Sequence, residues 1–247
     1  DVINATNNTV AGASFNTGAG SDTINGGSAA ETIDAGDGKD QTNLGASYGN
    51  DTITGGAGTD ILNGAGVGAN TTVTFTNGGG SFNSSGGNAS FNTIETIVTG
   101  SGNDVINAAG NTAPGATFNT GAGNDTITGG AAAENIDAGE GNDQINLGPI
   151  YGNDTIAGGG GSDTLSGAAL TGNASVTYSG GTGTISGAGG NASFTSIEAV
   201  ETGSGADTID ATGNTAAASF STGAGADSIL GGSGAETIDG GEGDDTI

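Results

Sequence analysis

The sequence contains no Cys, Met, Trp or His, and its only basic residue is Lys39. Without a thiol, the chain can form no disulfide bond, thiolate metal site or cysteine nucleophile. Without imidazole, it lacks the commonest general base and the commonest zinc ligand. No apolar run approaches the roughly 20 residues of a membrane-spanning helix. These absences exclude Cys- and His-dependent chemistry and predict no membrane insertion.

Positive charge is almost absent, whereas 27 Asp and Glu residues give a net charge of −26. A body this negative repels phosphate groups and anionic lipids, so nucleic acid is not an expected partner. Multivalent cations are the expected partners. Aromatic residues make up 4% of the chain, and this composition predicts a disordered chain when no cation is bound.

Glycine is abundant, with 55 residues among 247, whereas ordinary globular chains contain about 7%. Glycine loses more backbone entropy than any other residue when it is ordered, so helices are not expected. The few large side chains cannot fill one wide core. The sequence therefore predicts a thin core that repeats along the chain.

A long repeat organises the chain, because shifting the sequence by 103 residues aligns it with itself. DVIN at 1–4 returns at 104–107, and a third copy begins near Asp207. Both ends of the sequence lie inside the repeating pattern, so a longer parent protein is expected. The predicted divisions are 1–103, 104–206 and the partial repeat 207–247.

A nine-residue motif recurs inside each long repeat. From Thr17 the sequence reads TGAGSDTIN, GGSAAETID and AGDGKDQTN, and after two extra residues ASYGNDTIT and GGAGTDILN. Its acidic position is filled by Asp22, Glu31, Asp40, Asp51 and Asp60 in the first array (17–63), by Asp125, Glu134, Asp143, Asp154 and Asp163 in the second (120–166), and by Asp227, Glu236 and Asp245 in the third.

These segments resemble the RTX (repeats-in-toxin) family, whose nonapeptide is G-G-x-G-x-D-x-U-x with U a large apolar residue. GGAGTDILN at 55–63 and GGGGSDTLS at 158–166 match every defined position. The resemblance implies an all-β, right-handed parallel β-roll or β-helix solenoid with calcium ions between stacked Gly-Asp turns. The implied carboxylate ligands are Asp22, Asp40, Asp51, Asp60, Asp125, Asp143, Asp154, Asp163, Asp227 and Asp245. The implied carbonyl ligands are Gly18, Gly20, Gly36, Gly38, Gly56, Gly58, Gly121, Gly123, Gly139, Gly141, Gly159 and Gly161.

Five further acids match the pattern less well. Asp104 and Asp207 fit the motif but stand alone, outside the arrays. Glu31, Glu134 and Glu236 replace the usual Asp. Two roles stay open for these three glutamates: their longer side chains bind a metal, or they cap the turn.

The spacing explains why this pattern needs a cation. The x-U-x part of each motif alternates polar and apolar residues, which predicts a short strand with one side chain pointing inward. With two motifs in each coil, Asp22, Asp40 and Asp60 line one edge, while Glu31 and Asp51 line the other. Neighbouring strands lie about 4.8 Å apart, so stacked carboxylates repel each other. Calcium accepts about six to eight oxygen ligands and relieves this repulsion.

Other parts of the chain lack the acidic position. The half-turns around Phe15, Phe118 and Phe220 have Ala where the acid would stand and are expected to bind no metal. The spacers at 64–99 and 167–202 alternate polar and apolar residues, which favours strands. We expect them to continue the solenoid as metal-free, apolar-packed turns, with a small separate β domain as the alternative.

Together these patterns predict a calcium-dependent structural segment of a large secreted repeat protein, either an extracellular filament, an adhesin stalk or a surface layer. The resemblance implies type I secretion and an extracellular or cell-surface location. Self-association or continuation into further repeats is expected. Catalysis is not expected, because a uniform ladder gives each acid nearly the same surroundings. The alternatives are the C-terminal secretion and folding domain of an RTX toxin or hydrolase, and an ice-binding solenoid.

Overall fold

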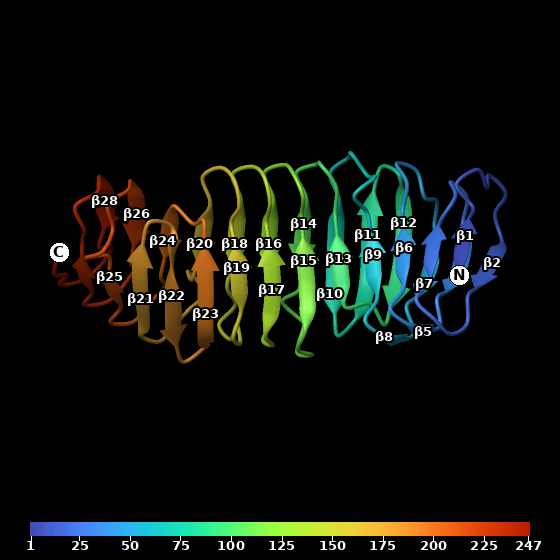
Figure 1. The fold of residues 1–247 in the computed structure, drawn as a ribbon. Coiled ribbons are helices and arrows are strands. Elements are labelled where there is room, and N and C mark those ends of the chain that lie inside the picture. The colour runs from blue at the N-terminus through green and yellow to red at the C-terminus, as the bar shows by residue number, and fades with distance from the viewer. The chain divides into compact units, whose positions relative to one another are not determined.

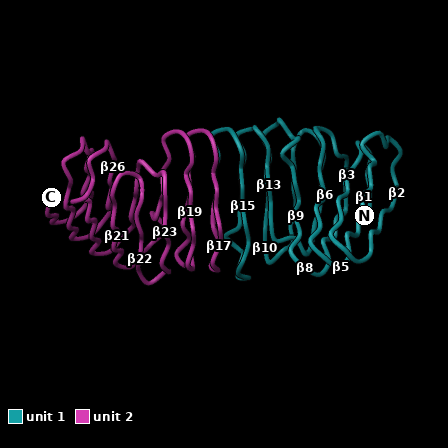
Figure 2. Tube along the Cα trace, viewed as in Figure 1, with its two compact units in different colours: residues 1–125 teal, residues 126–247 magenta.

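The computed structural model describes residues 1–247 and contains only β-strands and connecting turns. No helix long and apolar enough to cross a membrane is present. The chain forms two compact units, Asp1–Asp125 and Thr126–Ile247 (Figure 2).

In the first unit, the chain passes back and forth between two sheets of short strands (Figure 1). The first sheet contains β1 (Val2–Asn4), β3 (Thr23–Asn25), β6 (Gln41–Asn43), β9 (Ile61–Asn63), β13 (Thr96–Val98) and β15 (Ala116–Asn119). The second contains β2 (Ala13–Asn16), β4 (Glu31–Asp34), β7 (Thr52–Thr54), β12 (Gly87–Asn92), β11 (Gly79–Ser84), β10 (Thr72–Thr76) and β14 (Val105–Asn107). Two short strands in the turns, β5 (Asp37–Gly38) and β8 (Ala57–Gly58), pair with each other.

The second unit is built in the same way. One of its sheets contains β17 (Glu134–Asp137), β19 (Thr155–Ala157), β23 (Gly190–Thr195), β22 (Thr182–Gly187), β21 (Ala174–Ser179), β25 (Thr208–Asp210) and β27 (Ser228–Leu230). The other contains β16 (Thr126–Thr128), β18 (Gln144–Asn146), β20 (Thr164–Ser166), β24 (Ala199–Glu201), β26 (Ala218–Ser221) and β28 (Glu236–Asp239). The predicted all-β parallel solenoid is confirmed.

The apolar residue of most motifs lies in the core. Ile24 pairs in register with Thr42, and Thr42 with Leu62; all three side chains are buried. Thr42 therefore interrupts an otherwise apolar ladder. In the other motifs, the buried apolar residues at the equivalent position are Ile33, Ile53, Ile127, Ile136, Ile145, Ile156, Leu165 and Ile229.

The spacers differ from their predicted structure. In the first unit, β10, β11 and β12 form an antiparallel meander. Its outer strands pair in parallel with coils of the solenoid, β10 with β14 and β12 with β7. β21, β22 and β23 repeat this arrangement in the second unit. The spacers thus belong to the solenoid sheets, but the prediction that they continue it as ordinary turns is wrong, because the chain reverses direction twice.

Aromatic side chains pack in the core beside each meander. Phe75 and Phe118 meet edge to face with ring centroids 5.1 Å apart, and Tyr178 and Phe220 meet in the same way at 5.0 Å. The meanders thus supply Phe75 and Tyr178 to a core that the nonapeptide coils fill mainly with Ile and Leu.

Candidate metal centres

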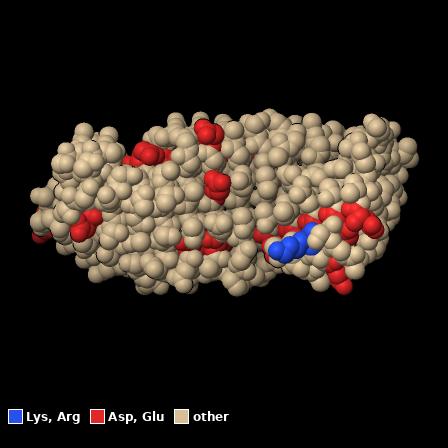
Figure 3. Space-filling model, viewed as in Figure 1, with Lys and Arg blue, Asp and Glu red and all other residues tan.

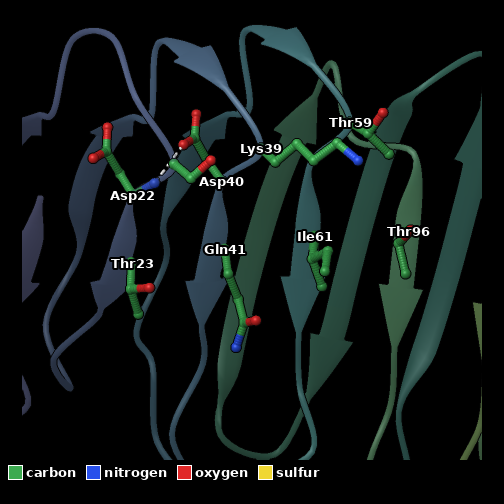
Figure 4. Close-up of a pocket in the computed structure, with 9 residues that line it drawn as sticks. Asp22, Thr23, Lys39, Asp40, Gln41, Thr59, Ile61 and Thr96 are labelled. Atoms are coloured by element: carbon green, nitrogen blue, oxygen red, sulfur yellow. Dashed lines mark hydrogen bonds between the residues drawn. The ribbon is translucent and has the colours of Figure 1, made fainter.

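One edge of the first unit carries the predicted row of aspartates. The backbone amide of Asp22 donates to Oδ1 of Asp40 over 2.8 Å (Figure 4). The amide of Asp40 donates to Oδ1 of Asp60 over 2.9 Å. Each carboxylate therefore uses one oxygen to join its coil to the preceding coil on that edge.

The remaining predicted aspartates form the same kind of link. The amide of Glu31 donates to Asp51, so this pair lies on the opposite edge, as predicted. In the second unit, equivalent bonds of 2.8–3.0 Å run from Glu134 to Asp154, from Asp143 to Asp163 and from Asp227 to Asp245.

The second carboxylate oxygen is the feature that indicates a ligand. It is buried without a hydrogen-bond partner in Asp22, Asp40, Asp51, Asp60, Asp154, Asp163, Asp207 and Asp227. These side chains belong to residues that are at most 2% exposed. An unsatisfied buried carboxylate oxygen carries a large desolvation cost, and buried charges are normally paired or bound to metal ions. A row of such oxygens fits a row of hard cations.

Burial also shifts the acid–base equilibria of these groups. It raises the pKa of Asp51 and of Asp154 to about 7, although the backbone amide of the preceding glutamate partly opposes the shift. Burial likewise raises the pKa of Asp60, Asp125 and Asp163. Burial therefore disfavours the ionised form of these carboxyl groups, and a bound cation would favour that form.

The single basic side chain does not neutralise the row. Lys39 lines a surface groove of about 300 Å³ together with Asp22 and Asp40. Its side chain extends away from both carboxylates toward Thr59 (Figure 4), and it forms no ion pair. On the face drawn in Figure 3, acidic atoms occupy only a few patches and uncharged atoms cover most of the surface. This view agrees with the burial of the aspartate row.

The turn carbonyls can complete a ligand set. No group of three or more acidic side chains converges on one point, so a metal ion here needs main-chain oxygens as well. The carbonyl of Gly18 accepts the amide of Asp37, and that of Gly36 accepts the amide of Ala57. A carbonyl oxygen has two lone pairs, so each of these retains one.

Successive turns stack so closely that only glycine fits between them. A Cβ atom on Gly36 would lie 1.8 Å from the carbonyl oxygen of Gly18, and one on Gly56 would lie 1.7 Å from that of Gly36. Cβ atoms on Gly38 and Gly58 would lie 1.5 and 1.6 Å from the carbonyl oxygens of Gly20 and Gly38. On Gly121 and Gly123 they would lie 2.2 and 2.1 Å from those of Gly100 and Gly102, and on Gly159 and Gly161 they would lie 1.9 and 1.8 Å from those of Gly139 and Gly141. The predicted carbonyl ligands therefore lie in register, one above the next.

Asp104 and Asp207, which are separate from the arrays in the sequence, lie next to them in the structure. Asp104 accepts the amide of Thr71, and its own amide donates to Asp125 over 2.6 Å. Asp207 accepts the amide of Ala174, and its own amide donates to Asp227. Through these bonds, each of the two residues connects the aspartates of an array to the first strand of a meander. The sequence could not reveal this because the meander intervenes between the arrays.

The glutamates of the arrays have partners of their own. Both carboxylate oxygens of Glu31 accept the amide of Gly27, and Oε1 also accepts the side-chain amide of Asn8. Glu236 likewise accepts the amide of Gly232 and the side chain of Asn214. Glu134 accepts the amide of Gly130 through both oxygens. These bonds favour the turn-capping role over metal binding.

Two further acids, which lie outside the predicted ligand set, accept the same kind of hydrogen bond from the preceding coil. The amide of Asp60 donates to Oε2 of Glu95 over 2.8 Å, and the amide of Asp163 donates to Oε2 of Glu198 over 2.9 Å. The signal was present in the spacers: ETIV at 95–98 and EAVE at 198–201 repeat the acid-x-apolar-x end of the nonapeptide. The missing glycine turn before each concealed it.

A sequence profile described as the RTX calcium-binding nonapeptide repeat, in four copies, matches residues 4–42, 46–67, 91–111, 116–145, 151–169 and 212–247. These segments make up most of the chain and contain both edges of stacked aspartates. No curated protein matches the chain.

Proposed function

The chain belongs to the RTX calcium-binding nonapeptide repeat family, and from this premise we propose that it is a calcium-dependent structural segment of a large secreted repeat protein. Membership makes it a calcium-binding repeat protein. The proposal adds that calcium binding folds the chain into an extracellular structural body, such as a filament, an adhesin stalk or a surface layer.

One observation carries the proposal: buried aspartates face a solenoid edge with one oxygen bonded to the neighbouring coil and the other oxygen unsatisfied. Such a row repels itself until a divalent cation is bound. Calcium supplies the positive charge, while Asp22, Asp40, Asp60 and the stacked glycine carbonyls supply oxygen ligands from adjacent coils. The free energy of metal binding thereby becomes folding free energy.

The expected affinity suits an extracellular protein. Calcium sites of extracellular modules have dissociation constants of about 10⁻⁴ to 10⁻³ M. At the far lower calcium concentration of a cytosol the net charge of −26 keeps the chain extended, which suits export as an unfolded chain. Outside the cell, calcium would fold it.

Self-association is part of the proposal. The parallel sheets grow by adding strands, and the edge strand of any sheet offers unpaired amide and carbonyl groups to another chain. Light scattering in calcium, compared with scattering after calcium removal, tests this part separately.

Circular dichroism tests the central claim. Removal of calcium with EGTA should convert the β spectrum to that of a coil, and an unchanged spectrum would contradict the proposal. Asp40→Asn should raise the calcium concentration at the folding midpoint, because it removes a buried ligand charge. Asp210→Asn is the matched control, because Asp210 is exposed and its carboxylate accepts hydrogen bonds only from Thr212.

A further inference from the structure

The boundary between each array and its spacer contains a polar cluster that the nonapeptide does not encode. Glu95 follows the meander and immediately precedes β13, in which Thr96 pairs with Ile61 of β9, so Glu95 lies next to Asp60 of the preceding coil. The amide of Asp60 donates to Oε2 of Glu95, and the amide of Glu95 donates to the carbonyl of Asp60. The Glu95 carboxylate therefore accepts an amide of the preceding coil, as the carboxylate of an array aspartate does.

The unsatisfied oxygen of Asp60 lies beside Gly55, close to the Thr93 carbonyl. Asp60 is 1% exposed, and its Oδ2 is buried without a partner. Oδ2 lies 2.7 Å from the point where a Cβ atom of Gly55 would stand, and the carbonyl oxygen of Thr93 lies 2.0 Å from the same point. A carboxylate oxygen and a main-chain carbonyl oxygen are thus gathered beside a glycine that leaves space between coils.

The backbone of Thr93 is held in an unusual conformation at this place. Its φ is +52°, which is uncommon for a residue other than glycine, and its side-chain hydroxyl accepts the amide of Gly56 over 2.7 Å. Only three non-glycine residues of the chain have a positive φ, and Thr93 and Ser196 are two of them.

The second long repeat builds the same cluster. Ser196 has a φ of +54°, and its carbonyl oxygen lies 1.9 Å from the Cβ position of Gly158, with Oδ2 of Asp163 at 2.6 Å. Asp163 is 1% exposed, its Oδ2 has no partner, and its amide donates to Glu198. The arrangement is therefore a repeated feature of the chain.

We propose that Asp60, Glu95 and the Thr93 carbonyl bind an additional calcium ion at the array–spacer boundary, and that Asp163, Glu198 and the Ser196 carbonyl bind its counterpart. The chemistry is that of a hard divalent cation, because every available ligand is oxygen and two are carboxylates. Each ion would join the last nonapeptide coil to the strand that follows the meander. The inference rests on the proposed calcium-dependent function and extends it to the spacers.

Glutamine substitution separates an ion ligand from a simple hydrogen-bond acceptor. Glu95→Gln and Glu198→Gln keep an amide oxygen that can accept the Asp60 and Asp163 amides, but they remove the charge. Equilibrium dialysis against calcium should show one ion fewer per chain for each substituted glutamate, with the β spectrum retained at saturating calcium. Glu201→Gln is the control, because Glu201 lies in the same spacer and bonds to Ser166 instead; it should bind the wild-type number of ions.

An unchanged ion count in the double variant would overturn the inference. If that variant fails to fold, anomalous scattering from calcium-grown crystals of the wild-type chain decides the question. A peak between Asp60 Oδ2 and Thr93 O supports the site, and no peak there alongside occupied array sites overturns it. A wild-type chain that binds no calcium at all would instead overturn the proposed function.

Discussion

Asp51 and Asp154 occupy equivalent positions in the two long repeats, and burial raises the pKa of each from an ordinary 3.8 to about 7. The folded chain therefore binds protons at these carboxyls more tightly than the unfolded chain does. Where the folded state holds more protons, stability falls as the pH rises. For these two groups the fall lies between about pH 4 and pH 7.

In buffer freed of calcium, the β signal should be stronger at pH 5 than at pH 8. In calcium the dependence should reverse, because the ligands must be deprotonated, so more calcium is needed to reach the folding midpoint below about pH 7. Circular dichroism across this range measures both effects. A double variant, Asp51→Asn with Asp154→Asn, should make the calcium-free profile shallower, with a remainder from Asp60, Asp125 and Asp163, whose pKa burial also raises. An unaltered profile would rule out Asp51 and Asp154 as its origin.

Glu31 occupies the acidic position of its motif, as Asp51 does, but both of its carboxylate oxygens accept hydrogen bonds from the protein. Its carboxylate is buried and hydrogen-bonded to Gly27 and Asn8, so its coil is closed by protein donors. We expect Glu31→Ala to destabilise the calcium-loaded chain by about 1–3 kcal/mol, because it leaves buried donors unsatisfied. The number of bound calcium ions should stay the same, as measured by equilibrium dialysis. A loss of one ion would instead show that Glu31 is a ligand.

At the scale of the element, the turn is defined by close contact between glycines. Gly36 has a φ of +95°, and a Cβ atom there would lie 1.8 Å from the Gly18 carbonyl oxygen. Gly36→Ala should lower stability in calcium by more than about 1 kcal/mol, since both the conformation and the space exclude a side chain. Thermal unfolding measures the change. Gly45→Ala is the control, because its nearest contact would be an ordinary 3.6 Å; equal melting temperatures for the two variants would contradict this account of the turn.

The nonapeptide coils could be predicted in detail from the sequence. Regular spacing of Asp22, Asp40 and Asp60 determined which acids share an edge, because each coil contains two motifs. The meanders could not be predicted from polar–apolar alternation, which is the same for parallel and antiparallel strands. The turn chemistry did contain a signal: Asn77-Gly78 connects β10 to β11 with a positive φ at both residues, and Asn-Gly is a strong hairpin indicator.

The candidate site was only partly predictable for a related reason. Ligands inside an array follow from the motif, whereas Glu95 comes next to Asp60 only because the meander brings its strand back beside β9. Contacts of this kind depend on the path of the intervening chain, which the local pattern does not specify.

For the whole molecule, the net charge of −26 opposes folding through repulsion, and bound cations reduce this repulsion. Sodium ions screen exposed charges, but they cannot supply the divalent charge that buried carboxylates require. Magnesium prefers near-ideal octahedral geometry at about 2.0–2.1 Å and retains its water, whereas calcium tolerates irregular oxygen ligands at longer distances. Stacked carbonyls and single carboxylates from different coils form an irregular set of oxygen ligands, which suits calcium.

Calcium should therefore compact the chain at concentrations where magnesium and ionic-strength-matched sodium chloride do not. Small-angle X-ray scattering gives the radius of gyration, and circular dichroism on the same samples reports the β content. We expect sodium to contract the unfolded chain slightly without raising its β content, because screening weakens repulsion but joins no coils. If magnesium folded the chain as fully as calcium at equal concentration, neutralisation alone would explain folding, and the buried aspartate oxygens would have no selective role.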